Sequence, residues 1–217
     1  MMASILILVL SLPSFAGIEG PDIPDFYGPL PYDGKPVDKM MIGISTYKDM
    51  DSSSSNLFDS NFIQFYMPIV PADLRVDIFL PKGSDSKYLQ LGTVIPMGIA
   101  SIKGSFMTKV GGTSTGNEIN IDVIFGGMLF NWGLGISNIS GGGSSNTYPS
   151  LKIAKDVDLW AMKLEGKVAI TKIDPDTETD ITVKVRPGAF PIYAGIGYSM
   201  FGSNNITMFL LGALFSL

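Results

Sequence analysis

The stretch that decides the fold runs from Arg186 to Leu217 and reads RPGAFPIYAGIGYSMFGSNNITMFLLGALFSL. It holds two apolar runs, joined by Ser203, Asn204 and Asn205. A short connection of Ser and Asn between two apolar runs is typical of a β-hairpin. The glycines in the first run would weaken a helix. The sequence therefore ends in a predicted β-hairpin.

The last run of this hairpin is apolar on both faces. Side chains alternate between the two faces of a strand, so Phe209 and Leu211 share one face while Met208 and Leu210 share the other. An uncovered strand of this kind would aggregate in water, so protein or lipid must cover it. The run is also as long as the about 9 to 11 residues that a tilted strand needs to cross a bilayer.

This closing strand resembles the C-terminal strand of bacterial outer-membrane β-barrels. The string AGIGY at residues 194–198 is of the kind that such strands carry. Strands of that family usually end in an aromatic residue, whereas this chain ends in Leu217 with Phe215 two residues earlier. The resemblance implies an all-β fold, an antiparallel up-and-down transmembrane β-barrel, and a place in the bacterial outer membrane.

Composition excludes several classes of protein. The chain has 217 residues, which suits one domain, and only 16% of them are charged, against an average of about 25%. The few basic residues form no stripe that would bind nucleic acid. Cys and His are absent from the sequence, which removes thiol nucleophiles and serine triads. We therefore expect no enzyme, no cofactor and no metal site.

The N-terminal 38 residues divide into two parts. Residues 1–16 hold a short apolar run followed by Pro13 and then Ser-Phe-Ala, which predicts a signal peptide. Residues 17–38 contain five prolines, which exclude a helix and a central strand. They predict an extended arm that serves as a linker or tail. The alternative is a segment that lies inside a barrel lumen or binds a partner through its aromatic residues.

Residues 39–217 read as a series of strands with alternating side chains. We expect a barrel of 8 to 10 strands, because twelve would leave almost no residues for loops. Residues 151–164 read as one strand. Turns are expected at residues 96–98 and 165–167, and residues 141–150 (GGGSSNTYPS) read as a flexible loop.

A membrane barrel turns its apolar residues outward and its polar residues inward. The mean hydropathy of +0.30 is high for a water-filled porin, so we expect a partly apolar lumen. Charged side chains in the lumen would need partners. They would form either a selectivity constriction or ligand site, or a structural plug of salt bridges. The candidates are Arg75, Asp77, Asn120, Asp122, Lys163, Glu165, Lys184 and Arg186.

One acidic run could also supply oxygen ligands for Ca²⁺. Asp174, Asp176, Glu178 and Asp180 stand at alternate positions. The run lacks the glycine and the distal Glu of a helix-loop-helix calcium site. We interpret it as a solvated acidic turn.

These patterns favour an outer-membrane barrel that is a passive pore or transporter of small, partly apolar solutes, or a purely structural barrel. Its expected partners are membrane lipid and a small solute. The alternative is a soluble secreted β-barrel or β-sandwich that binds a hydrophobic ligand, in which the face assigned to lipid would be the core.

Overall fold

The computed structural model describes residues 30–50, 59–82, 87–111, 116–141, 144–173, 176–188 and 190–217. The predicted signal peptide and the first part of the arm lie outside these residues. In the described part of the chain, no helix is long and apolar enough to span a membrane. The strands are β1 (Met41–Asp49), β2 (Ser60–Ile69), β3 (Ala72–Pro81), β4 (Lys87–Met97), β5 (Ala100–Val110), β6 (Gly116–Phe125), β7 (Asn131–Gly141), β8 (Ser144–Leu159), β9 (Met162–Ile173), β10 (Asp176–Pro187), β11 (Ile192–Phe201) and β12 (Asn204–Ser216).

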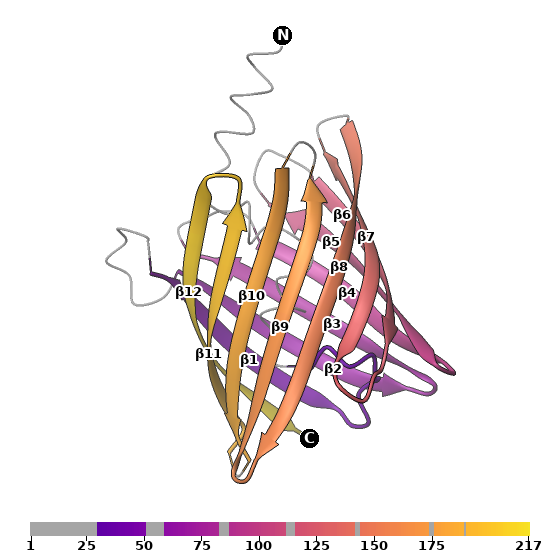
Figure 1. Ribbon diagram of the computed structural model, residues 1–217, viewed down its shortest axis with the longest axis vertical. Coiled ribbons are helices and arrows are strands. Elements are labelled where there is room, and N and C mark those ends of the chain that lie inside the picture. The colour runs from indigo at the N-terminus through magenta and orange to yellow at the C-terminus, as the bar shows by residue number, and fades with distance from the viewer. Residues whose placement is uncertain are drawn as a thin grey trace.

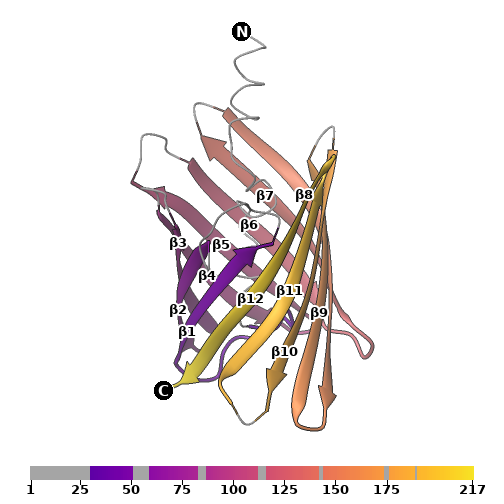
Figure 2. The ribbon, with the colours of Figure 1, turned by 90° about the vertical axis from the view of Figure 1, so that its left-hand side faces the viewer.

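The strands form one closed antiparallel barrel (Figures 1 and 2). Each strand pairs with its neighbours in sequence, and β12 pairs with β1 from Met41 opposite Ser216 to Asp49 opposite Met208. The predicted C-terminal hairpin is confirmed as β11 and β12. Its apolar last strand is paired on both edges, with β11 and with β1, so this strand leaves no free edge.

The expected number of 8 to 10 strands is wrong, since the described residues form twelve. Twelve strands fit because several connections at one end of the barrel take only two residues. These are Val70 with Pro71, Gly98 with Ile99, and Trp160 with Ala161. Hardly any chain is spent on loops at that end.

Several expected segment boundaries are also wrong. Residues 151–164 belong to two strands, because the chain turns at Trp160 and Ala161. The expected turn at residues 165–167 lies inside β9, and residues 144–150 of the expected loop belong to β8. Glycine and serine are common in turns, but a barrel strand paired on both sides holds them in extended conformation. Local composition therefore misplaces the turns.

The strands turn apolar side chains outward and most polar side chains inward. On β3, the outward Leu74, Val76 and Ile78 alternate with Arg75 and Asp77, which are 5% and 2% exposed. A soluble barrel would show the reverse pattern, with charges in water and aliphatic residues inside. The arrangement fits a barrel surrounded by lipid and argues against the soluble alternative.

The two ends of the barrel differ. The end that holds the five connections β2–β3, β4–β5, β6–β7, β8–β9 and β10–β11 is called here the turn end, and the opposite end is called the loop end. The start of β1 and the C-terminus lie at the turn end, where the Leu217 amide donates to the Met40 carbonyl at 2.9 Å. Residues 30–38 precede β1 and enter the lumen from this end.

Candidate functional site: the lumen and its plug

Residues 30–38, called here the plug, cross the lumen from one wall to the opposite wall. At one side, the Val37 amide donates to Asp73 Oδ2 at 3.0 Å and Arg75 Nη2 donates to the Lys35 carbonyl at 3.2 Å. At the other side, Lys167 Nζ donates to the Leu30 carbonyl at 3.1 Å. These contacts lie on β3 and β9, which are six positions apart in the ring of twelve strands. The described part of the arm therefore takes the lumen position that the sequence left open as the alternative.

Tyr32 anchors the middle of the plug. Its side chain is 5% exposed and packs with Ile124 of β6 and Ala154 of β8. Lys103 Nζ lies 5.3 Å from the centre of the Tyr32 ring, within the range of a cation–π contact. The ring reaches the β7 wall at Gly133, where a Cβ atom would collide with the phenol oxygen. A tyrosine at this place therefore requires a glycine in the wall.

Asp73 joins the plug to the β3–β4 wall. Its Oδ2 atom accepts from Arg75 Nη2 at 2.9 Å and from the Val37 amide, and its Oδ1 atom accepts from the Val94 amide at 2.7 Å. Asp73 and Arg75 are both buried. A buried carboxylate is tolerated where donors satisfy its oxygens, so this residue fixes both the arginine and the plug.

Three further buried ion pairs lie inside the lumen, two of them shared by Glu165. Lys152 Nζ of β8 lies 2.9 Å from Asp122 Oδ2 of β6. Glu165 Oε1 of β9 lies 2.9 Å from Lys167 Nζ and 3.1 Å from Lys184 Nζ of β10. The five side chains are at most 5% exposed. Long charged side chains of this kind fill space that a twelve-strand barrel leaves open, since only barrels of about eight strands are filled by ordinary side chains.

The structure places all eight sequence-derived candidates on the lumen side, but in three separate groups. Arg75 and Asp77 lie on the β3 wall, where the Tyr66 hydroxyl donates to Asp77 Oδ1 at 3.2 Å. Asn120 and Asp122 lie on β6, and the Asn120 side chain donates to Ser105 Oγ at 3.4 Å. The third group is Lys163, Glu165, Lys184 and Arg186 on β9 and β10.

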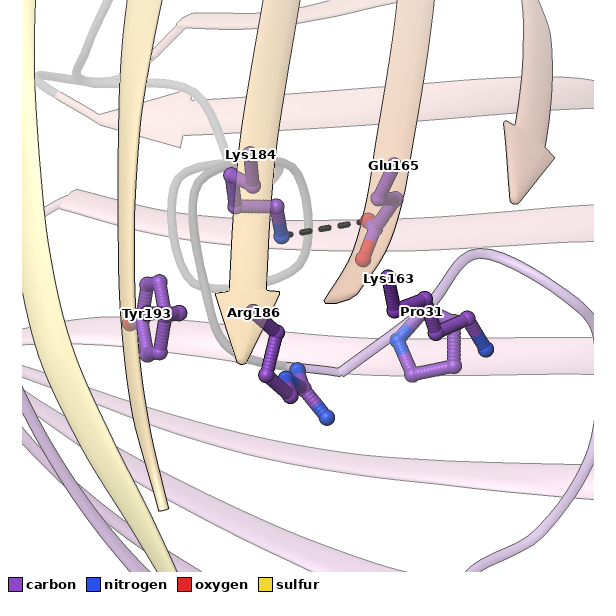
Figure 3. Close-up of a pocket in the computed structure, with 6 residues that line it drawn as sticks. All are labelled: Pro31, Lys163, Glu165, Lys184, Arg186 and Tyr193. Atoms are coloured by element: carbon purple, nitrogen blue, oxygen red, sulfur yellow. Dashed lines mark ion pairs between the residues drawn. The ribbon is translucent and has the colours of Figure 1, made fainter. Parts of the chain in front are cut away.

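The third group lines a small pocket (Figure 3). Pro31 of the plug forms one side of it and Tyr193 of β11 another. The cavity volume is about 10 Å³, roughly the space that one water molecule needs. Lys163 also pairs with Asp156 at 3.0 Å, and Lys184 lies 5.9 Å from the Tyr193 ring centre. Three cations and one carboxylate therefore surround a space that the plug partly fills.

Sequence reasoning missed several lumen residues. Lys152 stands between Leu151 and Ile153, which is the same alternating signal that identified Arg75. Lys167 was hidden because residues 165–167 read as a turn. No local pattern marks Asp73 as a contact residue, because its partners are distant in the chain, whereas Tyr32 is one of the aromatic residues that the alternative interpretation of the arm relied on.

The acidic run does not form a solvated turn. Glu178 and Asp180 face the lumen from β10 and are each 8% exposed, while Asp176 is exposed. Asp174 lies outside the described residues. Among the described residues, no group of acidic side chains is placed to hold a metal ion.

The loop half of the lumen holds an apolar cluster beside the buried acidic side chains of Glu118, Glu178 and Asp180. Phe62 and Phe79 stack with ring centres 4.7 Å apart, Tyr47 lies 6.3 Å from Phe79, and Tyr88 lies 5.6 Å from Phe79. The set called here the aromatic cluster spans the lumen from β1–β4 to β9 and β12, and consists of Tyr47, Phe62, Phe79, Tyr88, Ala169, Ile206, Met208 and Leu210. The prediction of a partly apolar lumen is confirmed by this cluster.

The sequence matches no protein-family model and no curated protein. The structure is similar to that of a KdgM porin at 9% identity and a TM-score of 0.56, over 82% of this chain and 99% of the porin. A KdgM porin in complex with disordered oligogalacturonate gives 9% identity and a TM-score of 0.55 over the same shares. Such low identity shows the fold alone. The resemblance to bacterial outer-membrane barrels is thereby confirmed in the architecture, and the chain has the closed β-barrel fold of the porins.

Proposed function

We propose that this chain is a passive pore of the bacterial outer membrane for small, partly apolar solutes, and that the structure is its closed state. Two features support a pore. The outer surface is apolar and fits lipid, while the inner surface carries charged side chains of both signs that can contact a polar solute once the lumen opens. The fold shared with KdgM porins supports the same function.

Two barriers lie in series along the lumen. The plug crosses the turn half, among Asp73, Arg75 and Lys167. The aromatic cluster lies in the loop half, where an apolar constriction also excludes water. A solute that passes both sections meets ion pairs in the turn half, and aromatic rings beside the acidic Glu118, Glu178 and Asp180 in the loop half. This sequence of surfaces favours a small solute with a polar and an apolar part.

The observation that carries the proposal is the way in which the plug is held. Residues 30–38 belong to no strand, and hydrogen bonds, a cation–π contact and side-chain packing hold them against the wall. The barrel itself is closed by strand pairing around the whole ring, although β3 and β4 pair only from Arg75 opposite Gly92 to Phe79 opposite Tyr88. The plug can therefore leave the lumen without any strand separating, as weakly connected segments open at lower free energy than the fold as a whole.

Single-channel conductance in planar bilayers tests this proposal. We expect the full chain to be silent or nearly so, and a variant that lacks residues 30–38 and carries Phe79→Ala to conduct in discrete steps. Each single change is the matched control, and because the barriers act in series, each should conduct less than the combined variant. A combined variant that shows a heat-dependent gel shift, and is thus folded, yet stays silent would make the protein a structural barrel.

Lipid and a small solute remain the proposed partners, with no nucleic acid. The absence of enzymatic activity stays a prediction. It rests on the lack of His and Cys in the sequence.

A further inference from the structure

The five connections at the turn end contain no polar side chain. They consist of Val70-Pro71, Gly98-Ile99, residues 126–130 (GGMLF), Trp160-Ala161 and residues 188–191 (GAFP). Their large side chains are turned outward to an unusual degree. The exposed fractions are 91% for Val70, 89% for Ile99, 98% for Met128, 108% for Trp160 and 64% for Phe190. The described connecting residues at the loop end, by contrast, include the polar Asp59, Lys82 and Ser203 beside the exposed Met50.

The outward-facing apolar side chains along one strand form a row on the barrel wall. These rows are too short by themselves to cross a membrane. With about 3.4 Å per residue and a tilt of about 40°, the row from Met162 to Ile170 on β9 rises about 21 Å. By the same estimate the row from Ile119 to Phe125 on β6 rises about 16 Å. Outer-membrane barrels present an apolar band of about 25 Å. The rows reach this height only if the turns at their ends are part of the band.

One lysine marks where the band ends. Lys155 faces outward from β8, and its Nζ atom donates to the carbonyl of Met128 in the β6–β7 turn at 3.4 Å. Lysines on a lipid-facing surface extend along it until their ammonium reaches the headgroups. The ammonium of Lys155 lies beside the β6–β7 turn. The lipid headgroups are therefore expected at the depth of this turn.

Trp160 provides independent evidence for the depth of the turn end in the membrane. It has a φ of 55°, in the left-handed region that glycine or asparagine adopts more readily. A tryptophan held there with its whole side chain exposed gains nothing from protein packing. Indole rings are favoured at the boundary between hydrocarbon and headgroups, where the ring is in an apolar layer and its N–H is in a polar one.

We infer that the turn end of the barrel is submerged in the lipid leaflet, with the apolar turns inserted at the boundary between acyl chains and headgroups. The occupant of this surface is lipid, because the exposed apolar turns continue the lipid-facing rows, and Lys155, which interrupts the row on β8, extends its ammonium to the β6–β7 turn. The mouth of the lumen at this end then opens within the headgroup layer. This inference rests on the proposed membrane location, and the test below separates the two.

Tryptophan fluorescence can test the inference because the sequence has two tryptophans. Trp132→Phe leaves Trp160 as the reporter at the turn, and Trp160→Phe leaves Trp132, which lies on the lipid-facing side of β7. A third variant, with both replaced by Phe and Ser203→Trp added, reports on the β11–β12 turn at the loop end. Each is refolded into phosphatidylcholine vesicles whose acyl chains carry bromine at defined depths.

We expect the emission of Trp160 to be quenched by brominated chains to an extent similar to that of Trp132, most strongly by bromine near the headgroup. The indole introduced by Ser203→Trp should instead be quenched by aqueous iodide. Quenching of Trp160 by iodide alone would place the turn in water and overturn the inference. Protection of Trp160 from both quenchers would also overturn it, since a protein surface such as a second copy would then cover the turn. If Trp132 also escapes the bromolipids, the proposed membrane location itself fails.

Discussion

The phenol of Tyr32 occupies the space that a side chain at Gly133 would fill. Tyr32 belongs to the plug and Gly133 to the lumen wall on β7, 101 positions later by their residue numbers. Tyr32 is one of the aromatic residues of the arm noted in the sequence, whereas nothing in the sequence marks Gly133. Together they form a socket that holds the centre of the plug, and this pairing gives a direct way to displace the plug from the wall side.

Gly133→Ala should loosen the plug, because the new methyl group collides with the Tyr32 hydroxyl. The chain has no cysteine, so Val37→Cys introduces a single thiol at a buried plug position. We expect a membrane-impermeant thiol reagent to label Val37→Cys severalfold faster in the Gly133→Ala background. Gly104→Ala is the control, since a methyl group there meets open space. Equal labelling rates in the Gly133→Ala and Gly104→Ala backgrounds would mean that Gly133 does not help to hold the plug.

The docking of the plug should depend on pH through Asp33. Burial raises the pKa of its carboxyl above the ordinary value of 3.8, although the Lys35 amide donates to it at 3.0 Å. A raised pKa means that the charged carboxylate weakens docking. This penalty is fully present at neutral pH and disappears as the pH falls through the raised pKa.

Asp33→Asn should therefore tighten the plug at neutral pH. Both proteins carry Val37→Cys, and the thiol is labelled with a dipyridyl disulfide, which reacts with thiols even in acid. At pH 7 the protein that keeps Asp33 should be labelled faster than the one with Asp33→Asn. The ratio of the two rates should approach one as the pH falls below the raised pKa. A ratio that does not change with pH would show that Asp33 has no part in docking.

The buried pair of Lys152 and Asp122 should be costly to break. Lys152→Ala leaves the Asp122 carboxylate buried without its lysine and should lower stability by about 3 to 5 kcal/mol. The midpoint of urea unfolding, followed by the heat-dependent gel shift, measures this. Lys163→Ala is the control, since its pair with Asp156 is partly exposed and should contribute about 0 to 1 kcal/mol. Replacing both buried partners, by Lys152→Met with Asp122→Leu, should restore most of the loss.

Leu211→Arg should test the lipid-facing surface of β12. Leu211 is 39% exposed and faces outward in the middle of the strand. An arginine there should cost about 2 to 4 kcal/mol if it lies near the bilayer midplane. Asn205→Arg at the loop end of the same face should cost about 0 to 1 kcal/mol. A Leu211→Arg barrel that inserts and unfolds like wild type would mean that this face does not meet lipid.

Much of the barrel wall could be predicted from the sequence. The alternation around Arg75 and Asp77 identified lumen-facing positions, and the apolar residues beside them identified the outer surface. Lys167 was missed because Gly166 beside it resembles a turn, although β9 continues through both. Short-range signals fail at such positions since pairing on both sides holds a glycine in a strand.

The sequence by itself determined that the chain is all β, that its last hairpin is apolar on both faces, and which side chains alternate toward the lumen. These properties follow from the period of two in a strand, which needs only neighbouring residues. Only the tertiary structure decided the number of strands, the position of residues 30–38 inside the barrel, and the pairing of Tyr32 with Gly133. Each of these depends on the closed ring, whose circumference sets how wide the lumen is and which distant residues meet across it.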